Sequence, residues 1–373
     1  MTKVCILTSV HPRHDTRIFI KQCVSLGRAG YDVTLIVADG KEDEEKEGVR
    51  ILDIGISRFG RAGRMTRTVI AVYKKALNMN ADIYHFHDPE LIPAGLLLKA
   101  LGKKVIYDVH EDYPKAILSK HYLPSWMCRL TAWAFEVFES IAARRFSGIV
   151  SVTPAIAKRF ESRNKNTVTI QNFPITDELN ISETVAWKKR SNAVAYVGVI
   201  GVLRGVKEMV EAAELASKKT DVHLILAGDF FPQSLKEEVE SMEGWKQTKY
   251  LGYLPREKVA RLFDKIKAGL VLIHPEPRYQ VSYPVKLFEY MSSGVPVIAS
   301  NFSLWREIVE GAGCGLLVNP LKPKEIADAV IYILENPEEA QEMGKNGRRA
   351  VKERYNWGME EKKLLGLYEV LLP

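Results

Sequence analysis

The chain has 373 residues, of which 46% are hydrophobic, and this length is enough for two ordinary domains that each have a core. It has no apolar run of the roughly 18 residues that a membrane-spanning helix needs, and MTKVCILTSVHP is too short an apolar start for a secretory signal, so we expect a cytoplasmic protein. The chain has a net charge of +7, but it contains no module of interleaved aromatic and basic residues of the kind that binds nucleic acid. Nucleic acid is therefore not an expected partner. The four cysteines form no CxxC pair, and we expect them to be packing residues.

Short apolar runs rich in β-branched residues alternate with amphipathic stretches through the first half of the chain. This alternation is typical of a parallel sheet that is covered by helices on both faces. The predicted strands are VCILTSV, YDVTLIVA, VRILDIG, DIYHFH, KKVIYDVH, GIVSVT and TVTIQN. We predict a solvated loop for the charged stretch KEDEEKE at residues 41–47.

Two of these strands end in histidine and acid, in YHFHDPE and YDVHEDYP. The carboxyl ends of parallel strands meet at one edge of a sheet, which predicts a cluster of His85, His87, His110, Glu111 and Asp112. The i, i+2 spacing points the first two histidines in the same direction, but a metal would still need a third ligand from elsewhere, and we predict no metal site. His110 is either a donor to a sugar or acceptor, or a capped histidine at a strand end.

Residues 115–165 carry nine Lys or Arg against three Glu, with Trp126 and Trp133 on the apolar pattern of the same segment. This mixture suits an anionic lipid surface and predicts a peripheral contact at the inner face of the membrane. A core-facing helix with a solvated basic face is the commoner arrangement. Both interpretations stay open.

The sequence becomes polar around residues 175–192, and a second series of strands and helices follows. Its predicted strands are AVAYVGVI, HLILAGDF, TKYLGYL, GLVLIHP, VPVIAS and GLLVNP. We therefore predict one domain over residues 1–185 and a second over residues 190–355. The expected fold class is α/β, with two doubly wound Rossmann-like domains that face each other across a cleft and bind the ligand at the carboxyl ends of the strands.

A glycine-rich turn follows the first strand of the second domain, in YVGVIGVLRGVKEMVEAAELA at residues 196–216. Gly198, Gly201 and Gly205 let the backbone come close to a phosphate, and Arg204 is placed either to reach a diphosphate or to cap the turn. The glycine spacing differs from the GxGxxG fingerprint of a dinucleotide dehydrogenase.

The stretch YPVKLFEYMSSGVPVIAS at residues 283–300 predicts a helix of about nine residues between Pro284 and Gly294. The free N–H groups at its start form an anion site at the strand ends. Lys286 adds a positive charge in the first turn, and Glu289 can accept two hydrogen bonds from a ribose diol. The pair matches a nucleotide-sugar, and a surface ion pair is the structural alternative.

Taken in this order, the motifs resemble the nucleotide-sugar glycosyltransferases of family 4, which have the two-domain GT-B architecture. The resemblance begins at residues 11–40, continues through DIYHFHDPELIPAG, VIYDVHEDYP and IQNFP, and is strongest over residues 270–309. It implies retaining, metal-independent transfer of a sugar from a UDP- or GDP-sugar to a glycan or lipid-linked acceptor, in surface polysaccharide or glycoconjugate synthesis. It implies no separate cofactor. It also implies a C-terminal helix over residues 356–373 that crosses back to the first domain.

The resemblance also implies roles for single positions. Glu289 is similar to the glutamate that holds the donor ribose, and Lys286 and Arg204 are similar to the diphosphate ligands. His110 resembles the histidine that approaches the transferred sugar, so His110, Arg204 and Lys286 are the implied catalytic residues. Further donor contacts are implied at Gly201, Gly228, Ser282, Tyr283, Pro284 and Val285. The implied acceptor-side residues are Asp15, Arg17 and His87.

Two positions depart from the family pattern. Many members carry a second glutamate eight residues before the ribose glutamate, where this chain has Val281. The candidates to replace it are Glu276, Gln280 and Ser282. The GR pair that many members place after the first strand of the second domain is Gly198-Val199 here, so one phosphate ligand is missing.

Without that glutamate, attack on the face from which the diphosphate leaves is favoured over a double displacement, which needs a carboxylate nucleophile. Fixed cations and helix N–H groups suit the charge that develops on the leaving diphosphate. Three other functions stay open. They are another GT-B enzyme such as a nucleotide-sugar 2-epimerase, a non-catalytic nucleotide-sugar-binding protein, and a nicotinamide dehydrogenase, which the glycine spacing disfavours.

Overall fold

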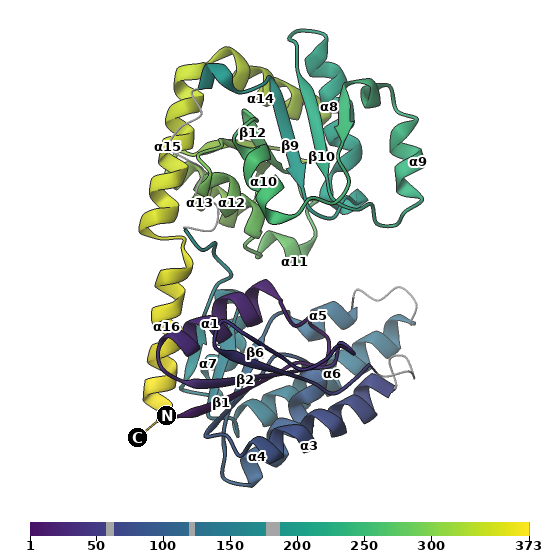
Figure 1. Cartoon of the computed structure of the whole chain (residues 1–373). Helices are drawn as coiled ribbons and strands as arrows, with labels where there is room; N and C mark the ends of the chain where they lie inside the picture. The colour runs from purple at the N-terminus through teal and green to yellow at the C-terminus, as the bar shows by residue number, and fades with distance from the viewer. Residues whose placement is uncertain (57–62, 119–123, 177–186, 373) are drawn as a thin grey trace. The chain divides into compact units, whose positions relative to one another are not determined.

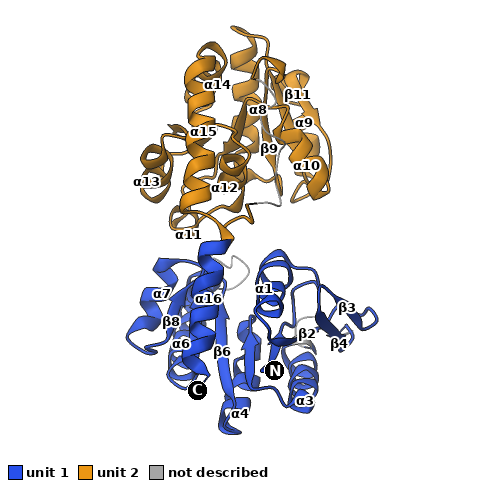
Figure 2. Cartoon of the chain, turned by 60° about the vertical axis from the view of Figure 1, so that its left-hand side comes forward, with its two compact units in different colours: residues 1–172, 358–373 blue, residues 173–357 orange. Residues whose placement is uncertain are grey.

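The computed structural model of the chain describes residues 1–56, 63–118, 124–176 and 187–372 (Figure 1). The chain divides into two compact units, which Figure 2 shows in blue and orange. Unit 1 comprises Met1–Asn172 and Gly358–Pro373, and unit 2 comprises Phe173–Trp357. The boundary predicted between residues 185 and 190 falls partly on residues outside the described ones.

Unit 1 contains an eight-stranded sheet in the order β3-β4-β2-β1-β5-β6-β7-β8. Its strands are β1 Lys3–Leu7, β2 Asp32–Val37, β3 Glu44–Lys46, β4 Val49–Asp53, β5 Ile83–Phe86, β6 Lys104–Val109, β7 Gly148–Ser151 and β8 Thr167–Thr169. The strands predicted in this half are confirmed, and all described pairs are parallel except β3 with β4. The prediction of a loop over residues 41–47 was wrong for Glu44–Lys46, which pair with β4 as a charged, short edge strand.

An apolar cluster joins the strands of this sheet to some of the helices that cover it. The described helices of unit 1 are η1 Thr16–Cys23, α1 Val24–Arg28, η2 Arg64–Thr68, α3 Val69–Met79, η3 Pro89–Leu91, α4 Ile92–Ala100, α5 Tyr113–Leu118, α6 Ser125–Ala143, α7 Pro154–Glu161 and α16 Trp357–Leu371. All four positions of β5 are buried, as expected for a strand covered on both faces. The four cysteines of the chain are buried, as expected for packing residues.

Unit 2 contains a six-stranded parallel sheet in the order β11-β10-β9-β12-β13-β14. Its strands are β9 Ala193–Val197, β10 His223–Ala227, β11 Thr248–Tyr250, β12 Ala268–Val271, β13 Val297–Ser300 and β14 Gly315–Val318. All were predicted. The strand order reverses at β9, between β10 and β12, and ligands of open α/β sheets bind beside such a reversal.

The helices of unit 2 pack on both sides of its sheet around two apolar clusters. They are η4 Trp187–Lys189, η5 Val202–Arg204, α8 Val206–Ser217, α9 Leu235–Glu240, η6 Glu243–Gln247, α10 Arg256–Phe263, α11 Pro277–Gln280, α12 Val285–Ser292, α13 Ser303–Ala312, α14 Pro323–Glu335 and α15 Pro337–Glu353. The predicted class, α/β with two Rossmann-like domains, is confirmed. Among the described helices, none is long and apolar enough to cross a membrane.

Candidate functional site

A pocket of about 580 Å³ lies in unit 2, where β9 and β10 end. Gly198 follows β9 directly, and Gly228 follows β10, so the pocket occupies the point at which the strand order reverses. Six of the donor-binding residues predicted from the sequence line it, namely Arg204, Gly228, Pro284, Val285, Lys286 and Glu289. The structure therefore brings together residues that lie up to 85 positions apart.

The backbone at these strand ends requires glycine at two positions. Gly228 has φ +137°, and a Cβ atom there would lie 2.0 Å from the carbonyl oxygen of Gly198. Gly205 has φ +73° at the start of α8, and its Cβ atom would lie 2.5 Å from the carbonyl oxygen of Leu272. Any side chain at either position would push the loops at the strand ends apart. Arg204 precedes this second glycine, and its guanidinium stacks 4.8 Å from the ring centroid of Tyr279.

The amino end of α12 faces the same pocket. Pro284 is its N-cap residue and gives no side-chain cap, so the first N–H groups of the helix remain available to an anion. The Nζ atom of Lys286 lies 3.8 Å from the ring centroid of Tyr196. Burial, followed by the positive charge of Arg204, lowers the pKa of Lys286 to about 7. A bound anion opposes both effects and restores the lysine charge.

Glu289 lies one turn further along α12 and is nearly buried. Its Oε1 atom accepts a hydrogen bond from Nη1 of Arg256, the first residue of α10. Sequence reasoning missed Arg256, and it also missed Asp229 and Tyr253, which line the same pocket. Asp229 carried a signal, because it is a polar residue directly after the predicted strand HLILAGDF.

Three residues that were predicted to bind the nucleotide-sugar do not line this pocket, which is formed by described residues only. Gly201 is the N-cap residue before η5, and its carbonyl oxygen accepts a hydrogen bond from the Arg204 amide. The hydroxyl of Ser282 donates to the carbonyl oxygen of Tyr279 at 2.8 Å. The ring of Tyr283 packs against Phe173 and Phe288. Val281 is exposed, and Gln280 donates its side-chain amide to the carbonyl oxygen of Pro275.

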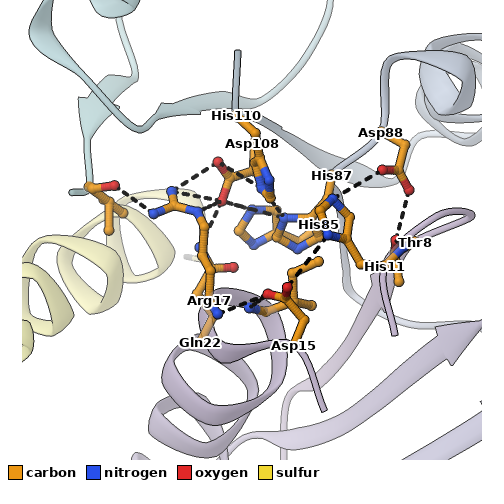
Figure 3. Close-up of polar contacts among 12 residues, drawn as sticks. Thr8, His11, Asp15, Arg17, Gln22, His85, His87, Asp88, Asp108 and His110 are labelled. Carbon is orange, nitrogen blue, oxygen red and sulfur yellow. Dashed lines mark hydrogen bonds and ion pairs between the residues drawn. The ribbon is translucent and has the colours of Figure 1, made fainter. Parts of the chain in front are cut away.

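A second polar cluster lies in unit 1 and centres on the buried carboxylate of Asp108, in β6 (Figure 3). The Nη2 atom of Arg17 lies 3.0 Å from both oxygens of Asp108, and Nε2 of Gln22 donates to Oδ2 at 2.7 Å. Burial raises the pKa of Asp108, but the charge of Arg17 acts against it, and the pKa lies below its usual range. Three imidazoles lie within 3.8 Å of this carboxylate, those of His85, His87 and His110.

The three imidazoles differ in their hydrogen-bond partners. His85 Nδ1 lies 2.9 Å from the hydroxyl of Tyr368 in α16, whereas His87 Nδ1 lies 3.0 Å from His110 Nε2. The rings of His85 and His87 stack, as their predicted common direction requires. Burial lowers the pKa values of His85 and His110 to about 4, and that of His87 well below its ordinary value. At neutral pH all three are therefore neutral.

His85, His87 and Asp108 bring potential ligand atoms within 4.8 Å of one another. The carboxylate already accepts the guanidinium of Arg17, and this fixed positive charge would repel a metal cation. The cluster is better suited to orienting His110, whose side chain is 14% exposed at its edge.

The acceptor-side residues predicted from the sequence fall into two groups. Asp15 is partly exposed and caps η1 by accepting hydrogen bonds from the amides of Arg17 and Ile18. Its hydrogen bond to His11 raises the pKa of that histidine. The side chains of Arg17 and His87 are buried, so they lie beneath the surface and not on it. Sequence reasoning missed the residue that joins them, Asp108, although a carboxylate within the apolar strand KKVIYDVH was a signal.

Two family models match the chain one after the other. The model described as Glycosyltransferase Family 4 matches residues 19–176, and the model described as Glycosyl transferases group 1 matches residues 177–350. The chain is also similar to curated proteins. It is 27% identical over 177 residues to alpha-D-kanosaminyltransferase from Streptomyces kanamyceticus, covering 47% of this chain and 45% of that protein.

Two further relatives match over more of the chain. MMP alpha-(1->4)-mannosyltransferase from Mycolicibacterium hassiacum is 21% identical, with 76% of this chain and 69% of that protein covered. Phosphatidyl-myo-inositol mannosyltransferase from Mycobacterium tuberculosis is 21% identical, with 84% and 79% covered. The chain thus spans less than half of the kanosaminyltransferase and more than two thirds of each mannosyltransferase.

Solved structures share the fold over the full length. Sucrose-phosphate synthase from Thermosynechococcus elongatus superposes with a TM-score of 0.75 at 19% identity, covering 100% of this chain and 99% of that one. Anabaena HepE in complex with UDP and glucose superposes with a TM-score of 0.74 at 17% identity, covering 99% and 100%. With two parallel-sheet units and consecutive matches to both family models, the chain belongs to the family 4 glycosyltransferases, enzymes of GT-B fold that use nucleotide-sugars.

Proposed function

We propose that the protein is a retaining, metal-independent glycosyltransferase that moves a sugar from a UDP- or GDP-sugar to a glycan or lipid-linked acceptor. The observation that carries the proposal is the unit 2 pocket, in which Lys286, Arg204 and the amino end of α12 converge beside Glu289. Two cations and free helix N–H groups suit a diphosphate, and a carboxylate suits the two hydroxyls of a ribose.

The relatives support this choice of substrates. HepE was solved with UDP and glucose, and two relatives are named as mannosyltransferases, one of them for phosphatidyl-myo-inositol. These names favour a nucleotide-sugar donor and a glycan or lipid-linked acceptor in surface polysaccharide or glycoconjugate synthesis. The proposed location is the cytoplasm, with a peripheral contact at the inner face of the membrane through residues 115–165.

The proposed chemistry is attack by an acceptor hydroxyl on the sugar C1 from the face that the diphosphate leaves. The acceptor oxygen bonds to C1, the bond from C1 to the diphosphate oxygen breaks, and that oxygen takes the acceptor proton. Lys286, Arg204 and the N–H groups of α12 stabilise the charge on the leaving diphosphate. His110 donates a hydrogen bond to the transferred sugar. Val281, in the position of the missing glutamate, offers no nucleophile for a double displacement.

The first test is donor binding, measured as a thermal shift against a panel of nucleoside diphosphates and nucleotide-sugars. The pocket variants are Lys286→Ala and Glu289→Ala, and the matched controls are Lys207→Ala on α8 and Glu310→Ala on α13, which lie outside the pocket. One nucleotide family should raise the Tm of the wild type and of both controls, but not of the pocket variants. A panel without any shift, or a shift that survives both pocket substitutions, contradicts the site assignment.

The second test is turnover of the donor identified in this way, with chelator present. Transfer to a glycan or lipid extract with an unchanged anomeric configuration, read by NMR, supports the proposal. Epimerised donor in the absence of an acceptor would assign a nucleotide-sugar 2-epimerase instead. Donor binding without any turnover across the acceptor panel would assign a non-catalytic binding protein.

A further inference from the structure

The solvent-facing side of α6 in unit 1 is apolar. At spacings of three or four residues it exposes a stripe that consists of Trp126, Leu130, Trp133, Val137 and Ile141. The two tryptophan residues are 67% and 64% exposed. Apart from Glu139, the residues that α6 buries are small, namely Cys128, Ala132, Ala142 and Ala143. This helix therefore turns its bulky apolar side chains outward, which is the reverse of the usual arrangement on a surface helix.

The helix α15 in unit 2 shows the ordinary arrangement within the same chain. Its exposed positions are charged or polar, as at Glu338, Glu339, Gln341, Glu342 and Lys345. A single exposed apolar residue needs no explanation, but a contiguous apolar stripe marks a surface that another phase or molecule covers. The exposed face of α6 is such a stripe.

The charges around this stripe are mainly positive. Arg129 is exposed beside it, and Arg144 and Arg145 are exposed at the carboxyl end of the helix. Within α6, all of whose residues are described, Glu136 is the exposed acid, because Glu139 is buried and pairs with Arg159. Tryptophan on an apolar face with flanking arginine is the composition of a helix that lies in the headgroup region of an anionic bilayer. A second copy of the chain would instead bring like charges together.

We propose that the apolar stripe of α6 docks unit 1 on an anionic lipid bilayer, with the helix axis parallel to the membrane plane. From Trp126 to Ile141 the stripe is about 22 Å long, at about 1.5 Å per residue. Its indole rings lie at the headgroup level, and Arg129, Arg144 and Arg145 contact lipid phosphates. This docking deepens the proposed function by bringing the enzyme to the surface that holds lipid-linked acceptors, and the lipid contact itself requires no turnover.

The test is flotation of the full-length protein with vesicles of phosphatidylcholine alone or with about 30% phosphatidylglycerol. The wild type should float with the anionic vesicles and bind them less as NaCl rises from about 0.1 M to about 0.5 M. The double variant W126A/W133A should bind at least about tenfold more weakly, because it loses the two largest apolar side chains of the stripe. The matched control is Phe231→Ala, which removes an exposed aromatic side chain from unit 2.

A charge variant and a folding control complete the test. R144E/R145E should weaken binding to the anionic vesicles only. Thermal-shift binding of the nucleotide should be unchanged in W126A/W133A, because the unit 2 pocket is untouched, so failed docking and a failed donor site are distinguishable. Absence of flotation by the wild type overturns the proposal. The proposal is also overturned if the wild type does not bind vesicles but dimerises with increasing concentration, and W126A/W133A abolishes this dimerisation. That result would assign the stripe to contact with a second copy of the chain.

Discussion

The Nδ1 atom of His87 lies 3.0 Å from the Nε2 atom of His110. The imidazole of His87 is fully buried, whereas that of His110 lies at the exposed edge of the cluster. Because both rings are neutral at neutral pH, one of these two nitrogens carries the shared proton. The Nε2 atom of His87 is buried and has no hydrogen-bond partner among the described residues. A buried N–H without an acceptor is rarer than a buried acceptor without a donor. We infer that His87 carries its proton on Nδ1, which leaves Nδ1 of His110 as a donor.

His87→Phe should therefore remove the contact that holds His110 in a single tautomer. We expect long-range ¹⁵N NMR of labelled histidine to show His110 protonated on Nδ1 in the wild type and a mixture of tautomers in the variant. Turnover should fall by about tenfold or more with little change in donor KM. The matched control is His85→Phe, because His85 is equally buried but contacts Tyr368. The same tautomer in the wild type and in His87→Phe would contradict the inferred role.

The affinity for the nucleotide-sugar should fall as pH rises. The pKa of Lys286 is lowered to about 7 in the empty pocket, by burial and then by Arg204, and only the ammonium form pairs with a diphosphate. Above this pKa, binding must take up a proton, so Kd should rise by up to about tenfold per pH unit. Calorimetry in buffers of different ionisation enthalpy should detect this uptake at a pH of about 8.

Lys286→Arg is the control for this pH dependence, because arginine stays charged over the whole range. It should bind with an affinity that changes little with pH and without proton uptake. A wild-type affinity that is equally insensitive to pH would show that Lys286 does not pair with the diphosphate.

Arg256 and Glu289 should act on donor binding as a coupled pair. The guanidinium contacts Oε1 of the glutamate and holds its carboxylate in one orientation in the pocket. Arg256→Ala should weaken nucleotide affinity, but less than Glu289→Ala does. A double-mutant cycle on Kd should give a coupling of about 1 kcal/mol. The control is Arg261→Ala, an exposed arginine on the same helix, and additive effects would show that Arg256 does not position Glu289.

Arg17→Met should destabilise unit 1. The substitution leaves the carboxylate of Asp108 buried without its cation, which costs about 3–5 kcal/mol. The folded state lowers the pKa of Asp108, so this contribution is present above its unfolded pKa of about 3.9 and is lost as pH falls. Urea unfolding at neutral and acid pH measures it, and Arg28→Met, at an exposed position, is the control. Unchanged stability with lost acceptor-dependent activity would favour a direct acceptor contact for Arg17.

Much of the lining of the unit 2 pocket was predictable from the sequence. In parallel sheets the chain leaves every strand at the same edge, so polar residues and glycines directly after predicted strands converge there. Arg204, Gly228, Lys286 and Glu289 meet in the pocket for this reason. Ser282 and Tyr283 were also predicted to contact the donor, but they do not line the pocket. The turn before α12 directs Ser282 to a backbone carbonyl and Tyr283 to aromatic side chains.

The sequence by itself determined the order of strands and helices, the two αβ series and the chemistry at the strand ends, because hydrophobic period and turn residues act locally. Only the tertiary structure decided which distant side chains meet. Asp108 pairs with Arg17, 91 residues away, and His85 meets Tyr368, 283 residues away. It also decided that α6 turns its large apolar side chains to solvent. A helical period shows that a face is apolar, but the path of the rest of the chain determines what covers that face.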